Sequence, residues 1–227
     1  MNVIETFNLH KTYNTTQVPV RAINGIDLEI EKGEFTAIVG PSGCGKTTLM
    51  NLIGGLDTPT EGYVMINNIK LAELSPTRLI DFRLHNIGFV FQSYNLIPVL
   101  TVKENIEFIM QLQGKSKKEC NARVDELLEA IGLTDKKDQR PNQLSGGQQQ
   151  RVSVARALAS KPQFILADEP TANLDSKATN ELLELMEKLN REENMTFIFS
   201  THDSRVMQKA RRLITLDDGK IIKDVTL

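Results

Sequence analysis

The sequence contains few cysteines and none at a spacing that binds metal. Cys44 and Cys120 are the only two among 227 residues, and no C-x-x-C or Cys/His ligand pattern occurs. Neither a disulfide framework nor a structural zinc site is therefore indicated. We expect a chain that works in a reducing cytoplasm.

Long apolar runs and a strong net charge are also missing. No uninterrupted apolar segment approaches the roughly 20 residues that a membrane-spanning helix needs, and the N-terminus lacks a basic region followed by an apolar one. We expect no membrane span and no export signal of this kind. Lys and Arg number 27 against 29 Asp and Glu, for a formal net charge of −2. Binding to nucleic acid through phosphate neutralisation is therefore disfavoured.

Several short runs rich in Val, Ile and Phe predict buried strands. Their continuous apolar character is typical of a parallel sheet covered by helices on both faces. These runs occupy residues 35–39, 88–91, 164–167, 196–199 and 213–216. Helical patterns fall between them, one from Thr47 to about Ile53 and another after Ser176. Alternating strands and helices predict an α/β fold.

Two other parts of the chain show different patterns. Residues 20–35 and 61–71 alternate apolar and polar residues around Asn-Gly, Lys-Gly and Asn-Asn pairs, which predicts an antiparallel sheet with tight turns. Residues 101–159 are nearly all helical in pattern, so a helical subdomain at roughly 93–160 is expected inside the α/β core. The run 115–119 is expected as a solvated loop between helices. No repeat or linker is visible, and we expect residues 1–227 to form a single domain.

A phosphate-binding loop is predicted at residues 40–47, whose sequence GPSGCGKT matches G-x-x-x-x-G-K-[ST] between a strand and a helix. Glycines allow the backbone to wrap closely, so that its N–H groups and the following helix N-terminus face phosphate oxygens. Lys46 is expected to reach the β- and γ-phosphates, and the Thr47 hydroxyl to bind Mg²⁺. The ATP-binding residues predicted here are Gly40, Pro41, Ser42, Gly43, Cys44, Gly45, Lys46, Thr47 and Thr48.

An acidic pair, Asp168 and Glu169, follows the predicted strand 164–167. The carboxyl ends of such strands form the edge where open α/β sheets bind ligands. Asp168 can hold Mg²⁺, directly or through water, and Glu169 can orient and deprotonate an attacking water. Taken alone, two solvated carboxylates at the end of a strand would be about as good an interpretation, and the phosphate-binding loop favours the catalytic one.

The sequence LSGGQ at 144–148 opens a predicted helix. Ser145 and Gln148 have the spacing of a capping box, while Gly146 and Gly147 leave backbone N–H groups free, so a second anion site is expected there. A plain helix cap explains the Ser-x-x-Gln spacing equally well by itself. It does not explain the other motifs in the same chain.

Taken together, these motifs resemble the ATP-binding subunit of an ABC (ATP-binding cassette) transporter along the whole chain. Five motifs match in the family's order: GPSGCGKT at 40–47, Gln92 after a strand, LSGGQ at 144–148, LADEP at 166–170 followed by Asn-Leu-Asp175, and His202 in STHD. The resemblance implies a P-loop NTPase core of α/β class with a parallel sheet, an N-terminal antiparallel β-subdomain and the inserted helical subdomain. Within the family, the segments 54–62, 89–98 and 166–175 resemble the macrolide-export and lipoprotein-release group.

The resemblance also implies a head-to-tail homodimer with two ATP molecules at the interface. Each ATP would lie between the loop of one chain and Ser145 to Gln148 of the other, so that one chain alone holds no complete site. Gln92 would then touch Mg²⁺ and the attacking water, His202 the γ-phosphate, and Asp175 the dimer contact. Tyr13 matches the aromatic on which the family stacks adenine, although a tyrosine on a small sheet is nearly as good an interpretation.

The resemblance further implies an integral membrane permease as partner, with the chain attached to the cytoplasmic side of the cell membrane through it. Export or extraction of a lipoprotein, peptide or drug is the expected direction, and no nucleic acid is expected as a partner. An ABC-type ATPase that is not coupled to transport is the alternative. Members of the family that act in translation usually carry two cassettes in one chain, whereas only one phosphate loop and one LSGGQ occur here. A GTPase or small-molecule kinase would leave LSGGQ unexplained, and no D-x-x-G or N-K-x-D sequence is present.

Overall fold

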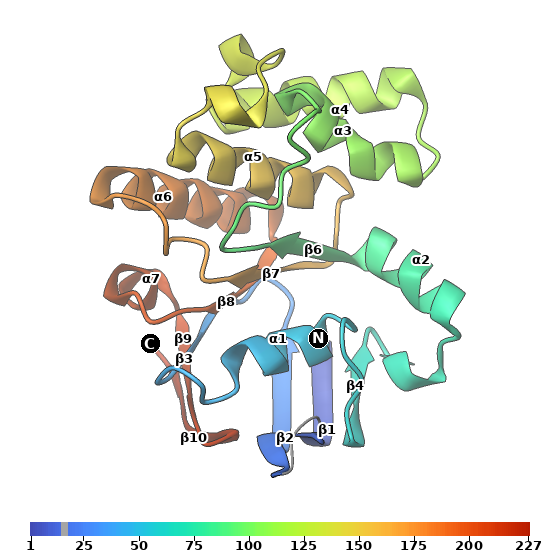
Figure 1. Cartoon of the computed structure of the whole chain (residues 1–227), viewed down its shortest axis with the longest axis vertical. Helices are drawn as coiled ribbons and strands as arrows, with labels where there is room; N and C mark the ends of the chain where they lie inside the picture. The colour runs from blue at the N-terminus through green and yellow to red at the C-terminus, as the bar shows by residue number, and fades with distance from the viewer. Residues whose placement is uncertain (15–17) are drawn as a thin grey trace.

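Two sheets and a stack of helices make up the fold in the computed structural model, which describes residues 1–14 and 18–227 (Figure 1). The strands are β1 Asn2–Tyr13, β2 Val20–Glu31, β3 Phe35–Val39, β4 Glu61–Ile66, β5 Ile69–Lys70, β6 Ile87–Val90, β7 Phe164–Asp168, β8 Thr196–Ser200, β9 Arg212–Asp217 and β10 Lys220–Thr226. The α-helices are α1 Lys46–Ile53, α2 Pro76–Asn86, α3 Val102–Leu112, α4 Lys117–Ala130, α5 Gly146–Ala159, α6 Ser176–Glu193 and α7 Ser204–Lys209. Short 3₁₀ turns are η1 Leu71–Glu73, η2 Thr134–Lys136 and η3 Pro141–Gln143.

The larger sheet has six strands in the order β10-β9-β3-β8-β7-β6. All neighbouring pairs are parallel except β10 with β9, and the smaller sheet, β2-β1-β4-β5, is antiparallel. The predicted α/β class with a parallel sheet and a separate antiparallel sheet is confirmed. Because the parallel strands point the same way, the segments after β3, β6, β7 and β8 leave the sheet at one edge.

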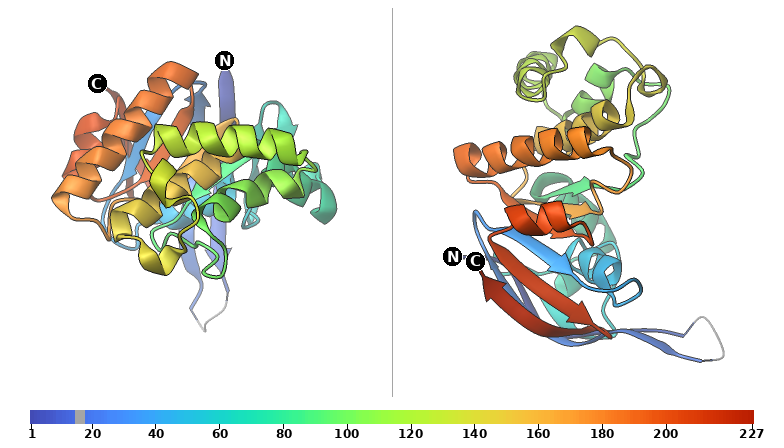
Figure 2. Two further views of the ribbon diagram at one scale, coloured as in Figure 1. Left: turned by 90° about the horizontal axis from the view of Figure 1, so that it is seen from above. Right: turned by 90° about the vertical axis from the view of Figure 1, so that its left-hand side faces the viewer.

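Both faces of the large sheet are buried, as the continuous apolar runs predicted. In β3, Phe35 and Ala37 belong to a core shared with α3, α4, α5 and α6, while Ile38 belongs to a second core with α1 and the antiparallel sheet. Successive side chains of a strand point to opposite faces, so one strand contributes to both cores. Figures 1 and 2 show the helices α3 to α6 on one side of this sheet and α1 with the small sheet on the other.

Three local predictions were wrong. Asn24-Gly25 is not a turn, because it lies inside β2 opposite an irregular stretch of β1, where Gly25 has φ +74°. One common type of β-bulge, like a tight turn, uses a glycine with positive φ. The run 115–119 is only partly a loop, since Ser116 caps α4 in a capping box with Glu119. Strand β9 is not buried throughout: only two of its residues are, and it pairs with the exposed edge strand β10.

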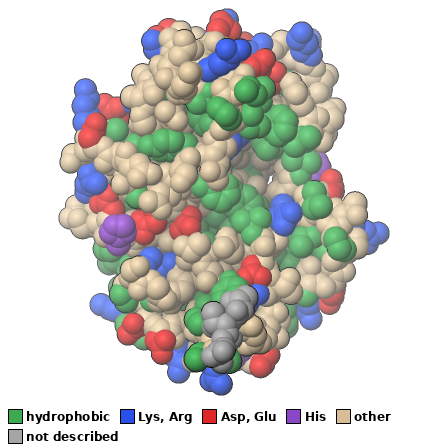
Figure 3. Space-filling model, viewed as in Figure 1, with side chains coloured by type: hydrophobic (Ala, Val, Ile, Leu, Met, Phe, Trp, Pro, Cys, Tyr) green, Lys and Arg blue, Asp and Glu red, His purple; other side chains and the backbone are tan. Residues whose placement is uncertain are grey.

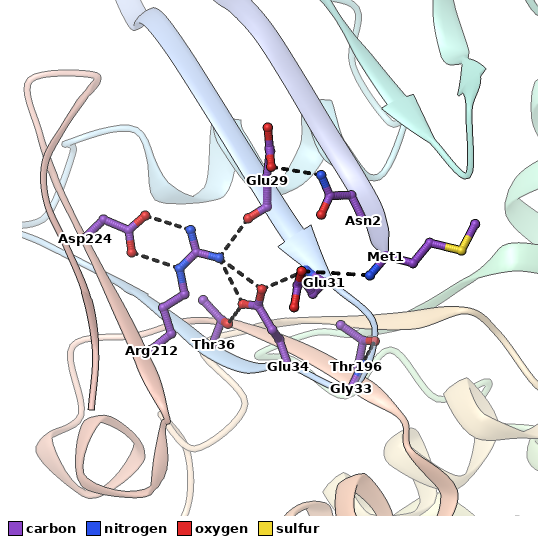
Figure 4. Close-up of polar contacts among 10 residues, drawn as sticks. All are labelled: Met1, Asn2, Glu29, Glu31, Gly33, Glu34, Thr36, Thr196, Arg212 and Asp224. Carbon is purple, nitrogen blue, oxygen red and sulfur yellow. Dashed lines mark hydrogen bonds and ion pairs between the residues drawn. The ribbon is translucent and has the colours of Figure 1, made fainter.

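An ion cluster around Arg212 joins the start of β9 to β2, β3 and β10 (Figure 4). The guanidinium donates from Nε and Nη2 to the two Asp224 oxygens at 2.8 and 2.7 Å, and from Nη1 to Glu34 Oε1 at 3.0 Å and the Glu29 carbonyl at 2.7 Å. These bonds to Asp224 and Glu34 raise the pKa of Arg212 above its ordinary value, although burial acts against them. The cluster fixes the two sheets against each other on the side away from the loop at 40–45.

Candidate functional site

A pocket of about 650 Å³ lies at the edge of the large sheet where β3, β6, β7 and β8 end. It brings together segments that are far apart in the sequence: the predicted phosphate loop, Gln92, Glu169 and His202. Among the residues that the structure describes, the lining is Val20, Arg21, Ala22, Gly40, Pro41, Ser42, Gly43, Gly45, Lys46, Thr47, Thr48, Gln92, Glu169, His202 and Asp218.

The loop between β3 and α1 has the backbone geometry that its glycines allow. A Cβ on Gly40, at φ +150°, would lie 2.2 Å from the Leu216 carbonyl oxygen, and one on Gly45, at φ +107°, 2.4 Å from the Ala22 carbonyl oxygen. Side chains are excluded at both positions, so the chain can wrap tightly. The Lys46 ammonium donates to the Gly40 and Pro41 carbonyls at 2.8 and 2.9 Å and is nearly buried. The ammonium group therefore lies inside the loop, where phosphate oxygens would replace these carbonyls as its hydrogen-bond acceptors.

Cys44 is the one residue of the predicted loop, between Gly40 and Thr48, that does not line the pocket. Its side chain is 5% exposed and belongs to the core between the sheets and α1. The thiol therefore packs beneath the loop, and only the backbone of Cys44 remains available to a phosphate.

Asp168 and Thr47 lie side by side although Asp168 is not part of the pocket lining. The Thr47 hydroxyl donates to Asp168 Oδ1 at 3.3 Å, which joins the start of α1 to the end of β7. A hydroxyl, a carboxylate and the amide oxygen of nearby Gln92 are hard oxygen donors, and Mg²⁺ is commonly held by one or two carboxylates together with substrate phosphates. No cluster of three His, Cys, Asp or Glu occurs in residues 1–14 and 18–227. The oxygen donors of Thr47, Asp168 and Gln92 fit Mg²⁺.

Glu169 and His202 are in direct contact. His202 Nδ1 lies 2.8 Å from Glu169 Oε1, and the other carboxylate oxygen, Oε2, is buried with no hydrogen-bond partner. Glu169 also has φ +49°, a strained conformation for a residue other than glycine. Its backbone N–H donates to the Ser200 carbonyl at 2.9 Å, so β8 holds the strained residue in place. Glu169 lines the pocket, and a carboxylate at such a position is suited to accept a proton from water.

Ser145 to Gln148 lie outside the pocket. The predicted capping box is confirmed, because Ser145 Oγ accepts from the Gln148 N–H and Gln148 Oε1 accepts from the Ser145 N–H. Ser145 is exposed, and none of residues 145–148 is among the residues that line the pocket. Asp175 is likewise absent from the lining, and it caps α6 by accepting from the Ala178 N–H at 2.8 Å.

Tyr13 is near the loop but does not line the pocket either. Its hydroxyl donates to Asp57 Oδ2 at 2.7 Å, and burial together with this carboxylate raises the pKa of Tyr13. Burial opposes the shift at Asp57, where hydrogen bonds from Lys11 and Tyr13 nevertheless lower the pKa. The ring is therefore fixed at one orientation at the end of β1.

Some lining residues were missed by sequence reasoning. Val20, Arg21 and Ala22 start β2, and Asp218 lies in the turn between β9 and β10. They reach the loop only because the antiparallel sheet packs beside it, with the Gly219 carbonyl accepting from the Asn24 N–H at 2.9 Å. No motif marks them, so no signal in the sequence alone identifies them.

Comparison with known proteins gives a consistent result. A family model described as "ABC transporter" matches residues 23–172. The chain is 44% identical over 222 residues to the lipoprotein-releasing system ATP-binding protein LolD 1 of Rhodopseudomonas palustris, covering 97% of this chain and 98% of that protein. It is 43% identical over 225 residues to the macrolide export ATP-binding/permease protein MacB of Rhodopirellula baltica, covering 98% of this chain but 33% of that protein. The chain thus spans about a third of this relative.

A solved structure has the same fold. The ATP-binding cassette MJ0796 of Methanocaldococcus jannaschii, in a dimeric post-hydrolysis state bound to ADP and Pi, superposes with a TM-score of 0.91 at 44% identity. The match covers 99% of this chain and 98% of that one. Since the family model covers most of the chain and these relatives cover nearly all of it, the chain belongs to the ABC transporter family and is an ATP-binding, ATP-hydrolysing subunit of that family.

Proposed function

We propose that two copies of this chain close head to tail on two ATP molecules and that this closure drives a separate integral membrane permease. The observation that carries the proposal is the incomplete pocket. It holds the phosphate loop, Gln92, Glu169 and His202, whereas the exposed Ser145 and the half-buried residues 146–148 lie outside it. A second copy turned head to tail would supply Ser145 and Gly147 to the γ-phosphate, with Asp175 at the dimer contact.

Within this site the residues have separate roles. Backbone N–H groups of residues 42–48 hold the phosphates, and Lys46 neutralises their charge. Thr47, Asp168 and Gln92 would hold Mg²⁺, which when bound neutralises charge on the β- and γ-phosphates. Glu169 takes the proton of the attacking water, and His202, 2.8 Å from it, holds the γ-phosphate. Tyr13 provides an aromatic face for adenine beside Thr48.

A groove between α2, α3, β6 and α5 is the proposed permease site. It has a volume of about 590 Å³ and apolar walls that include Ile80, Phe89, Phe108 and Leu112, and no Asp or Glu lines it. Figure 3 shows hydrophobic side chains gathered around a hollow on this face. No helix in the described parts of the chain has the length and apolar character to cross a membrane. A permease seated in the groove would hold the chain at the cytoplasmic side of the cell membrane.

The names of the relatives suggest the direction of transport. LolD 1 is described as part of a lipoprotein-releasing system, and MacB as a macrolide export protein. We therefore propose export or extraction from the membrane, with residues 1–227 acting as one domain. Its helical part, roughly 93–160, carries part of the groove wall and LSGGQ at 144–148, which we call the signature sequence.

The substitution Glu169→Gln tests this function. Without a proton acceptor, ATP hydrolysis should fall by at least about a hundredfold while ATP still binds, so that an ATP-loaded dimer accumulates. Dimer formation is measured by light scattering after size-exclusion chromatography with ATP or ADP. Glu184→Gln, an exposed carboxamide substitution on α6, is the matched control and should behave like the original chain. Normal turnover by Glu169→Gln, or a permanent dimer without nucleotide, would contradict the proposal.

A further inference from the structure

Tyr94 lies between the proposed catalytic Gln92 and the groove, and its backbone is strained. Tyr94 has φ +59° and Asn95 φ +50°, two successive left-handed residues of which neither is glycine. Strain of this kind persists only where surrounding contacts over-determine the conformation. Contacts from other parts of the chain must therefore hold residues 94 and 95 in this conformation.

Arg156 of α5 holds the strained backbone. Its Nη2 donates to the Tyr94 carbonyl at 2.9 Å and its Nη1 to the Asn95 carbonyl at 2.5 Å. Burial lowers the pKa of Arg156, and no ion pair to a carboxylate is found for it in the described residues. A guanidinium that uses its planar fork on two carbonyls fixes both peptide units at once. The backbone that carries the Tyr94 side chain is thus held in one conformation.

The Tyr94 hydroxyl lies where a side chain on Gly146 of the same chain would stand. A Cβ placed on Gly146 would lie 2.8 Å from this hydroxyl oxygen, whereas its distance to the ring carbon Cζ would be 3.7 Å. The hydroxyl also lies 3.5 Å from the Asn173 carbonyl oxygen, and Asn173 Nδ2 donates to the Gln92 carbonyl at 3.0 Å. One tyrosine therefore occupies the side-chain space of the first glycine of the signature, and it is linked through Asn173 to the segment before Asp175 and to the Gln92 segment.

We infer that Tyr94 is a positioning residue that limits how closely the signature sequence approaches the Gln92 segment of its own chain, because its hydroxyl fills the space that a side chain at position 146 would need. The inference rests on the proposed head-to-tail dimer. In that dimer, Gln92 serves the ATP held by its own loop, and Ser145 serves the ATP held by the other copy. Contact through Tyr94 therefore couples the two ATP sites inside one chain.

The same geometry explains why position 146 is glycine. Gly146 is the first residue of α5 and does not have a positive φ, so its backbone accepts alanine, and alanine is the better helix former. What excludes a side chain here is the Tyr94 hydroxyl. Gly147 gives a matched comparison. A Cβ there would lie 2.8 Å from the Ala178 Cβ, and in the described residues only Ala178 comes within 4 Å of it.

The test uses the full chain carrying Glu169→Gln, and it measures the ATP concentration at which half of the protein is dimeric. Gly146→Ala should raise this concentration by about tenfold or more, because a displaced signature no longer meets the ATP of the other copy. Tyr94→Phe alone should stay within about twofold, since only a long hydroxyl contact is lost. With Tyr94→Phe and Gly146→Ala combined, the ATP concentration for half dimerisation should return to within about threefold of the parent value. Without the hydroxyl, the nearest ring atom, Cζ, is 3.7 Å from the new Cβ, which is an ordinary contact distance.

The control pair is Gly147→Ala with and without Tyr94→Phe, which should be equally impaired. Circular dichroism and binding of a fluorescent ATP analogue to the monomer confirm that each variant folds and keeps its own loop. If Tyr94→Phe fails to rescue Gly146→Ala, or rescues Gly147→Ala equally, or is itself as impaired as Gly146→Ala, the inference is wrong. Failure of the parent Glu169→Gln chain to dimerise with ATP would instead reject the proposed function.

Discussion

Removing the Arg212 guanidinium should destabilise the fold by an amount that the structure allows us to estimate. In Arg212→Met, the aliphatic stem remains, and the bonds to Asp224, Glu34 and the Glu29 carbonyl are lost. Breaking a fully buried ion pair by removing one partner costs about 3–5 kcal/mol. Here the side chains of Arg212, Glu34 and Asp224 are 19, 18 and 37% exposed, so water compensates part of the loss. We expect a decrease of about 2–3 kcal/mol in the free energy of unfolding.

Chemical and thermal denaturation measure this effect. A loss of about 2–3 kcal/mol corresponds to a melting temperature lower by about 5–10 °C for a chain of this size. Arg191→Met is the matched control, because Arg191 forms a 2.6 Å pair with Glu187 but is 68% exposed. Such a surface pair contributes less than about 1 kcal/mol. Adding Glu34→Gln to Arg212→Met should recover part of the loss, since it removes the stranded carboxylate. If Arg212→Met and Arg191→Met are equally stable, the burial argument is wrong.

Two further predictions concern ATP and the groove. Lys46→Ala should weaken ATP binding at least about tenfold, because it removes the ammonium charge that faces the phosphates. Titration calorimetry measures the affinity for ATP, and an unchanged affinity would contradict the phosphate-binding role of Lys46. Leu112→Lys, on the groove wall at 57% exposure, should reduce co-purification with the permease while the ATPase activity of the isolated chain stays the same. Ile222→Lys on β10, with 62% exposure outside the groove, is its control, and equal loss of the permease in both variants would reject the groove as the docking site.

Local patterns in the sequence predicted most secondary structure correctly. The run 35–39 is β3 with both faces buried, and the capping box at Ser145 and Gln148 forms as its spacing predicted. Both depend on neighbours within a few residues. The Asn24-Gly25 prediction was wrong because an Asn-Gly pair fits a bulge as well as a turn, and pairing with β1 decides between them.

The site was predicted only in part, for a similar reason. Motifs identified Lys46, Glu169 and His202, whereas Val20 and Asp218 carry no motif and were missed. Tyr94 lies in the segment 89–98, but that segment predicted no role for it. These residues contact the site because the antiparallel sheet packs beside the loop and because α5 binds the segment after β6. Such contacts between distant segments are set by packing, which the local sequence does not express.

The sequence by itself determined the chemistry of this protein, because a phosphate loop, an acidic pair and a capped glycine pair each require particular residue types at short, fixed spacing. Tertiary structure decided how these parts stand to one another. It placed Glu169 against His202, kept Ser145 outside the pocket and fixed Tyr94 against Gly146. These contacts depend on which strands end at the same edge of the sheet and on how α5 lies on that sheet. The distances between residues far apart in the sequence are set by the packed core and not by their spacing along the chain.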